Sequence, residues 1–329
     1  MKILIAGLGS IGRRHLRNLA ALGEQDILLL RTRRSTLPEE DLTGYPVEND
    51  LQAALEHKPQ AVIVTNPTAL HLEVAIPAAR AGCHLLLEKP VSDTLERIPQ
   101  LKQALAEGGG QALVGFQFRF HPGLQKAKQI LDAGVLGSLV AARAHWGEYL
   151  PNWHPWEDYR QSYAARPELG GGVVRTLCHP LDYLSWLLGG VNSVWAYTGS
   201  LAGLDLVVED TAEIGLRFTS GCLGSVHLDY VQRPPVHRLE IIGSRGTLCW
   251  DNADGAVKLF LAGEQADWQT FPAPEGFERN QMFLAQMAHF LEVVRGKAKP
   301  ACSLDDGIQA QRLINAVYRS AQEGQVIPL

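Results

Sequence analysis

The chain has 329 residues, a length typical of two domains, and its 46% hydrophobic and 20% charged residues are ordinary globular usage. This composition excludes a disordered chain, a collagen-like repeat and a coiled coil. The 30 Lys and Arg residues against 35 Asp and Glu give a formal net charge of −5 without a long basic run, so we expect no nucleic-acid partner.

Cysteine usage and the absence of long apolar runs indicate a cytoplasmic protein. The five cysteines are odd in number and scattered, and they form no C-x-x-C pair, which is not the pattern of a disulfide framework. The apolar residues 1–6 are followed at once by glycines and arginines, so they are too short for a signal peptide. No run approaches the ~18 apolar residues of a membrane span. We therefore expect a protein of the reducing cytoplasm that does not contact membranes.

Over the first 120 residues, short apolar runs alternate with helical patterns, as buried parallel strands and crossover helices do. Pro77 and Pro99 lie inside two helical patterns and are expected to kink or restart those helices. The pattern predicts an α/β domain over residues 1–120. Its expected strands are residues 2–6, 26–31, 61–65, 84–87 and 112–116, and its expected helices are 11–22, 51–58, 69–82 and one that ends at the glycines 108–110.

After Pro122 the pattern changes to that of an α+β domain over residues 121–329. Ser303 and Asp306 have capping-box spacing and predict a final helix over 304–322, whose assignment to either domain the sequence leaves open. Alternating segments at hairpin spacing predict an antiparallel sheet. Its expected strands are 191–197, 211–218, 223–231, 238–242 and 247–250, and helices are expected over 123–133 and after the glycines 170–172.

The first strand leads into a glycine motif, G-x-G-x-x-G, formed by Gly7, Gly9 and Gly12 with Ser10 and Ile11 between them. In a dinucleotide-binding loop the first glycine makes the tight turn, the second lets the backbone approach a pyrophosphate, and the third lets helix and strand pack closely. A glycine-rich turn is the alternative. Because strand, loop, helix and second strand follow in the expected order, we predict that this loop binds a nicotinamide dinucleotide.

The end of the second strand indicates which nicotinamide cofactor is bound. Arg31, Thr32, Arg33 and Arg34 stand there, and no carboxylate follows before Glu39. An acidic residue at this place would bind the ribose 2′-hydroxyl of NAD, whereas arginines give bidentate contacts to the 2′-phosphate of NADP. The segment favours NADP over NAD, with a solvated basic turn as the alternative.

The fifth strand leads into Glu88-Lys89-Pro90, and on this motif the chain resembles the Gfo/Idh/MocA (glucose–fructose oxidoreductase / inositol dehydrogenase) family, whose signature is E-K-P at this place. The resemblance covers nearly the whole chain. It implies a Rossmann domain followed by an α+β domain with a large open, mostly antiparallel sheet, which often mediates homodimer or homotetramer contacts. Further matching segments are Arg13-Arg14-His15, Thr65-Asn66-Pro67 with His71, residues 115–122, Gly170-Gly171-Gly172, His179-Pro180-Leu181-Asp182 and residues 186–189.

The resemblance implies an NAD(P)-dependent oxidoreductase that acts on a secondary alcohol or ketone of a sugar, nucleotide sugar or cyclitol. Lys89 matches the catalytic lysine and His179 the acid/base histidine. The chemistry agrees, since an imidazole with an ordinary pKa of about 6.5 can accept a hydroxyl proton and a lysine can stabilise an alkoxide. The cofactor-binding positions implied beside the glycine loop are Thr65, Asn66, Pro67, His71, Glu88, Lys89 and Gln117. The implied substrate-binding positions are Lys89, Arg119, Trp153, Arg160, Tyr163, Arg175 and His179.

Arg175 departs from the family pattern, because many members carry an aspartate four residues before the histidine. Either arginine binds an anionic substrate here, or catalysis is altered or lost. The departure keeps open a rival function, a non-catalytic cofactor-binding regulator on the same fold. A redox-assisted glycosidase of the family is a second rival.

Aromatic residues are dense between residues 145 and 163, and such rings are costly to leave in water. They either cover the site, with rings stacked on sugar faces, or serve packing and oligomer contacts. The segment is similar to a branch of the family associated with surface-polysaccharide and acidic-sugar pathways. No H-E-x-x-H motif or cysteine cluster occurs, so no metal site is predicted. His227 and His237, in strand patterns, are expected to be packed or surface residues.

Overall fold

The computed structural model describes residues 1–31, 42–263 and 266–329, and the chain divides into two compact units. The first unit comprises Met1–Gln117, Glu168–Gly170 and Arg279–Gln311, and the second comprises Phe118–Pro167, Gly171–Glu278 and Arg312–Leu329. The predicted division after residue 120 lies close to the first of these boundaries. The helix over 279–294, which the sequence did not predict, belongs to the first unit.

The first unit contains a six-stranded sheet in the order β3-β2-β1-β4-β5-β6, with every pair parallel. Nearly all strand residues from β1 to β6 are buried, which explains why they read as continuous apolar runs. The five predicted strands are confirmed, and the two-residue β3 was not predicted. The strands are β1 (Ile3–Ala6), β2 (Ile27–Leu30), β3 (Val47–Glu48), β4 (Ala61–Val64), β5 (His84–Leu87) and β6 (Ala112–Val114).

The helices of the first unit follow the predicted order. The helix that contains Pro99 begins at Ile98, so the proline lies in the first turn, where its missing N–H has no helical partner to lose; this agrees with the restart, one of the two predicted effects. Pro77 lies inside a helix that continues to Arg80. The helices are α1 (Ser10–Ala21), α2 (Leu51–Glu56), η2 (Thr68–Leu70), α3 (His71–Arg80), α4 (Ile98–Gly108) and α8 (Arg279–Val294), the last of which contacts α1.

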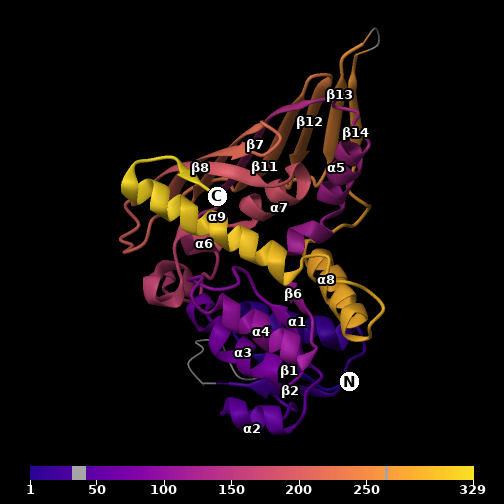
Figure 1. The fold of residues 1–329 in the computed structure, drawn as a ribbon, viewed down its shortest axis with the longest axis vertical. Coiled ribbons are helices and arrows are strands. Elements are labelled where there is room, and N and C mark those ends of the chain that lie inside the picture. The colour runs from indigo at the N-terminus through magenta and orange to yellow at the C-terminus, as the bar shows by residue number, and fades with distance from the viewer. Residues whose placement is uncertain (32–41, 264–265) are drawn as a thin grey trace. The chain divides into compact units, whose positions relative to one another are not determined.

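The second unit contains a nine-stranded sheet in the order β14-β13-β12-β11-β7-β10-β9-β8-β15 (Figure 1). All neighbours are antiparallel except β7 and β10, which run parallel, so the sheet is mixed though mostly antiparallel. The sequence missed β7 in the middle of the sheet, as well as β13, β14 and β15. The strands are β7 (Leu139–Gly147), β8 (Val191–Gly199), β9 (Thr211–Phe218), β10 (Leu223–Asp229), β11 (Val236–Gly243), β12 (Gly246–Asp251), β13 (Val257–Leu261), β14 (Trp268–Phe271) and β15 (Ile327–Pro328).

One face of this sheet carries helices and forms the core of the second unit. α5 (Pro122–Asp132) contacts β12 and β13, and α7 (His179–Leu188) contacts β7 and α5. Trp146, Tyr183, His237 and Trp250 are buried on this face, with the rings of Trp146 and His237 stacked at 4.4 Å. His237 is thus a packed residue. The alternate strand residues, among them His145 and His227, lie on the other face.

Four further short helical segments lie between Leu150 and Leu169: η4 (Leu150–Asn152), η5 (Tyr159–Gln161), η6 (Tyr163–Ala165) and η7 (Pro167–Leu169). The short helix α6 (Val173–Thr176) precedes α7, and the long helix α9 (Leu304–Glu323) lies near the C-terminal end of the chain.

The predicted capping box before α9 is confirmed. The Ser303 amide donates to Asp306 Oδ2 at 2.8 Å, and the Asp306 amide donates to Ser303 Oγ at 3.2 Å. Within the described ranges, none of the helices has the length and apolar character needed to cross a bilayer.

Candidate functional site

The glycine loop between β1 and α1 is built by contacts that only glycines permit. Gly7 has φ +101°, and a Cβ there would lie 2.5 Å from the Asn66 amide nitrogen. A Cβ on Gly12 would lie 2.0 Å from the Gly7 carbonyl oxygen. Thr65 Oγ1 donates to that same carbonyl at 2.6 Å, which ties the loop to the end of β4. Gly7 and Gly12 therefore shape the loop itself.

Gly9 differs from the other two glycines because a Cβ there would meet nothing within 4 Å. It is the N-cap of α1 with an ordinary φ of −70°, and no side chain caps the helix. The amides of the first turn, at Ser10, Ile11 and Gly12, belong to a helix N-terminus, which attracts anions. The open side of the loop and these amides fit a dinucleotide pyrophosphate.

The E-K-P turn follows β5, and its glutamate is anchored by α1. Glu88 Oε1 accepts a 2.8 Å hydrogen bond from His15 Nε2, and both side chains are buried. Burial raises the pKa of Glu88, but the His15 hydrogen bond and the positive charges of His15 and Lys89 outweigh it, so the pKa lies below its usual value. Glu88 is therefore an ionised carboxylate that fixes the backbone immediately before Lys89.

α3 anchors the other side of the same turn. His71 Nδ1 donates to the Pro90 carbonyl at 3.0 Å, and burial lowers the pKa of His71 below its usual value, so the ring is neutral. Since β1, β4 and β5 are parallel neighbours, their carboxyl ends bring the glycine loop, the 65–67 turn and the E-K-P turn to one edge of the sheet. Lys89 thus lies between Glu88 and Pro90, each fixed by a hydrogen bond to a helix residue, at the carboxyl edge of the parallel sheet.

The residues predicted to select NADP are only partly described. Arg31 is 8% exposed, and its amide donates to the Glu48 carbonyl at 3.0 Å, where β2 meets β3. Thr32 and Arg33 lie outside the described residues, so the predicted 2′-phosphate site stays a prediction.

In the second unit, Arg119 forms a buried ion pair with Asp182 of α7. Arg119 Nε lies 3.2 and 3.1 Å from the two carboxylate oxygens and Nη2 lies 2.7 Å from Oδ1, while the side chains are 5% and 1% exposed. His179, the first residue of α7, is buried against the rings of Phe118 at 5.0 Å and Trp146 at 5.4 Å. The pair holds the segment after Gln117 against the start of α7. The role of Arg119 in substrate binding stays a prediction.

Arg175, the departure from the family pattern, belongs to a cluster that the sequence did not reveal. Its guanidinium lies 4.6 Å from the centre of the Tyr318 ring, and its Nη1 donates to the Gly171 carbonyl at 3.4 Å. Tyr318 donates in turn to Glu209 Oε1 at 2.7 Å. Burial raises the pKa of Glu209, partly opposed by Tyr318 and Arg175. A carboxylate is thus present near position 175, but it comes from residue 209, which no local motif marks.

The aromatic segment contains both packed and exposed members. Trp153 packs edge-on against Tyr230 at 5.6 Å, and its buried Nε1 has no hydrogen-bond partner among the described residues. Arg160 is half exposed and paired with Asp158 through Nε and Nη2 at 2.9 and 3.0 Å. Tyr163 is 40% exposed. These three residues offer an indole donor, a guanidinium and a ring, and their contact with substrate stays a prediction.

Two sequence models of one oxidoreductase family match most of the chain. A sequence model described as "Oxidoreductase family, NAD-binding Rossmann fold" matches residues 1–116, and one for the C-terminal alpha/beta domain of that family matches residues 128–329. Myo-inositol 2-dehydrogenase of Thermotoga maritima is 27% identical over 342 residues, covering 100% of this chain and 98% of the relative.

Two solved structures show the same fold. Levoglucosan dehydrogenase in complex with NADH and levoglucosan has a TM-score of 0.88 at 19% identity, covering 100% of this chain and 99% of its own. The WlbA dehydrogenase of Bordetella pertussis, in complex with NADH and UDP-GlcNAcA, has a TM-score of 0.82 at 25% identity, covering 100% and 97%.

Proposed function

The chain belongs to the Gfo/Idh/MocA oxidoreductase family, and we propose that it transfers a hydride between a nicotinamide cofactor and a secondary alcohol or ketone of a sugar, nucleotide sugar or cyclitol. The observation that carries the proposal is the E-K-P turn, in which Lys89 stands between Glu88, bonded to His15, and Pro90, bonded to His71. The turn lies at the sheet edge that also bears the glycine loop. A lysine held there is placed to act on a group beside the cofactor.

In this proposal the bound nicotinamide cofactor supplies or accepts the hydride, and side chains handle the accompanying proton. His179 accepts the hydroxyl proton in the oxidative direction and returns it in reduction. Lys89 donates a hydrogen bond to the substrate oxygen and stabilises the negative charge that develops on it. Glu88 and His71 act as positioning residues, because Glu88 accepts a hydrogen bond from the Lys89 amide at 3.2 Å and His71 donates one to the Pro90 carbonyl at 3.0 Å.

The direct test replaces Lys89 by methionine, which keeps the length of the side chain and removes its charge. We expect Lys89→Met to abolish turnover while the affinity for the cofactor changes by no more than a few fold. Lys297→Met, at an exposed lysine of the same unit, is the matched control and should keep full activity. Turnover by Lys89→Met at the wild-type rate would refute the assigned role.

The rival function is a non-catalytic cofactor-binding regulator, which Arg175 in place of the usual aspartate favours. A panel of sugars, cyclitols and nucleotide sugars, assayed with NAD and NADP by absorbance near 340 nm, separates the two functions. Tight cofactor binding without turnover of any compound would favour the regulator.

We propose NADP as the preferred cofactor, supported by Arg31 and the adjoining Arg33 in the sequence. The NADH complexes of the structural neighbours make NAD the alternative. Replacing Arg31 and Arg33 together by alanine should weaken NADP far more than NAD. Equal effects on both cofactors would contradict the preference.

We propose further that the substrate is sugar-like and anionic, and that the chain works as a homodimer or homotetramer in the cytoplasm. Arg175 and Arg160 supply cationic groups in the second unit, and the WlbA neighbour, at 25% identity, is bound to UDP-GlcNAcA. Light scattering of the purified chain tests the oligomer. A preference in the substrate panel for neutral sugars over uronic acids and nucleotide sugars would contradict the anionic assignment.

A further inference from the structure

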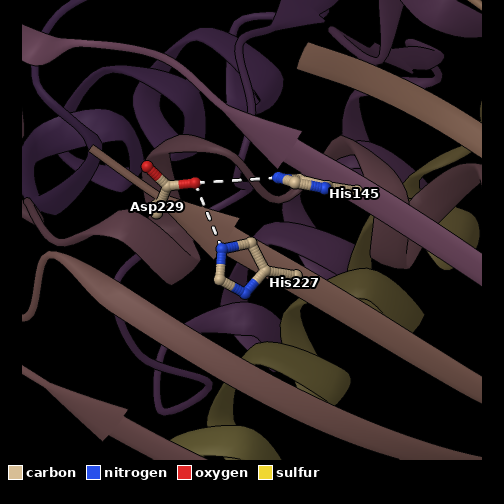
Figure 2. Close-up of side chains that lie close together, drawn as sticks. All are labelled: His145, His227 and Asp229. Atoms are coloured by element: carbon tan, nitrogen blue, oxygen red, sulfur yellow. Dashed lines mark hydrogen bonds and ion pairs between the residues drawn. The ribbon is translucent and has the colours of Figure 1, made fainter. Parts of the chain in front are cut away.

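Two histidines and an aspartate meet on the sheet face of the second unit that lies opposite Trp146 and His237. The parallel register of β7 and β10 sets His145 directly beside His227, and Gly147 beside Asp229. His227 Nε2 lies 3.1 Å from Asp229 Oδ2, and His145 Nε2 lies 3.8 Å from the same oxygen (Figure 2). One ligand atom from each residue lies within 4.8 Å of the other two.

The aspartate is held so that one oxygen faces the histidines. Asp229 Oδ1 accepts hydrogen bonds from the amides of Val231 at 2.7 Å and Gln232 at 2.6 Å. Oδ2 is left toward the rings, and the residue is 3% exposed. A Cβ at position 147 would lie 2.1 Å from Oδ2, so glycine at this position makes room for the carboxylate.

The two histidines complement this carboxylate in different ways. His145 Nε2 is buried and has no hydrogen-bond partner among the described residues. His227 Nδ1 is bonded to Glu213 Oε1 at 2.5 Å, which orients the ring and directs Nε2 toward Asp229. A histidine that binds a metal through one ring nitrogen usually donates the N–H of its other ring nitrogen to a carboxylate, as His227 does to Glu213.

Two arginines that line the same groove form ion pairs with carboxylates outside the cluster. Arg143 pairs with Glu240 at 2.9 Å, and Arg238 pairs with Asp251 at 2.6 Å. These two arginines are therefore balanced by carboxylates outside the cluster. A groove of about 480 Å³ runs over the same strands and is lined by His145, His227 and Glu213, so an ion and a water molecule have access.

We propose that His145, His227 and Asp229 bind one divalent transition-metal ion, with zinc the best match. Zinc takes imidazole nitrogen and carboxylate oxygen at about 2.0–2.2 Å in a tetrahedron, which sets neighbouring ligand atoms about 3.3 Å apart. The 3.1 Å separation fits this already. The 3.8 Å separation must shorten by about 0.5 Å, and the two histidine nitrogens, which lie within 4.8 Å of each other, must come to the same spacing. The fourth position faces the groove and takes water or a ligand from solution.

This site goes beyond the proposed function, because none of its residues belongs to the proposed catalytic or cofactor-binding set. A mononuclear site on a sheet face ties two strands together and adds the free energy of metal binding to that of folding. Its consequence is stabilisation of the second unit in the presence of the ion.

The experiment uses tag-free, full-length protein freed of metal by a chelator and dialysed against Zn²⁺, with metal counted per chain. We expect one zinc ion per chain at saturation, a raised melting temperature, and visible absorption typical of tetrahedral Co²⁺ when cobalt replaces zinc. His145→Gln and His227→Gln should each remove the single tight equivalent. Glu213→Ala should weaken zinc binding about tenfold, because the hydrogen bond that orients the His227 ring is lost.

His57→Gln is the matched control, since His57 also pairs with a glutamate, Glu48, at 2.9 Å but belongs to no metal-binding cluster among the described residues. It should bind zinc like the wild type. His145→Gln removes no hydrogen bond that holds the fold, so it carries the test even if His227→Gln does not fold. The proposal would be overturned if His145→Gln bound zinc as tightly as the wild type, or if the wild type bound no zinc ion at saturation.

Discussion

A buried histidine makes the stability of the second unit depend on pH. His121 is the N-cap of α5: its Nδ1 accepts the Gly123 amide at 3.0 Å, and its ring packs against Trp250 and Phe277, each at 5.0 Å. The residue is 1% exposed, and burial lowers the pKa of His121 to about 4. We choose His121→Asn as the perturbation, because an asparagine oxygen can replace Nδ1 as the cap while the group no longer titrates.

Between pH 6.5 and pH 4 the His121 ring is protonated in the unfolded state but stays neutral in the folded state. Protonation therefore stabilises the unfolded state, and the free energy of unfolding falls as the pH falls. For an ordinary pKa of about 6.5 and a folded pKa of about 4, the loss of unfolding free energy from pH 7 to pH 5 is about 2 kcal/mol. His121→Asn does not show this pH-dependent loss, because asparagine does not titrate. The loss of ring packing lowers its unfolding free energy by the same amount at every pH, so the pH dependence distinguishes the two effects.

Urea unfolding at pH 7, 6 and 5, followed by tryptophan fluorescence, measures the difference. All seven tryptophans lie in the second unit, so the signal reports the unfolding of the unit that contains His121. The advantage of the wild type over His121→Asn should shrink by about 2 kcal/mol between pH 7 and pH 5. A difference that stays constant to within about 0.5 kcal/mol would show that the folded ring titrates normally, against the burial argument.

Three further predictions follow from contacts described above. Gly12→Ala should cost more than about 2 kcal/mol of unfolding free energy, because its Cβ meets the Gly7 carbonyl. Gly9→Ala should lower the melting temperature much less, since only the N-cap preference for glycine is lost, but should weaken NADH at least about tenfold in a fluorescence titration; equal melting losses would contradict this. Arg119→Met should lower the free energy of unfolding in urea by about 3–5 kcal/mol, because it leaves the Asp182 carboxylate buried and unpaired. Adding Asp182→Leu should restore much of this loss, and a double variant no more stable than Arg119→Met would contradict the explanation. Ser303→Ala should cost about 1 kcal/mol by thermal unfolding, while Ser303→Thr, which keeps the capping hydroxyl, should not.

The sequence by itself determined the features that depend on neighbouring residues. The strands of the first sheet appear as apolar runs because both faces are covered, and the glycine loop and the E-K-P turn are contiguous motifs. The parallel order of β1, β4 and β5 then follows from the βαβ pattern. Local spacing therefore sufficed to predict the Rossmann fold and the family, which the comparisons confirm.

Only the tertiary structure decided what depends on pairing between distant segments. β7 carries three alanines, which have a low strand propensity, and its apolar–polar alternation covers only residues 142–146. It becomes a central strand because β10 and β11 pair with its two edges. The same pairing brings His145 beside His227 and Asp229. Likewise, α9 brings Tyr318 to Arg175, and the chain return at residue 303 adds a bridge to β6. No local pattern encodes these contacts, because their partners are separated along the chain and meet only when the sheets form.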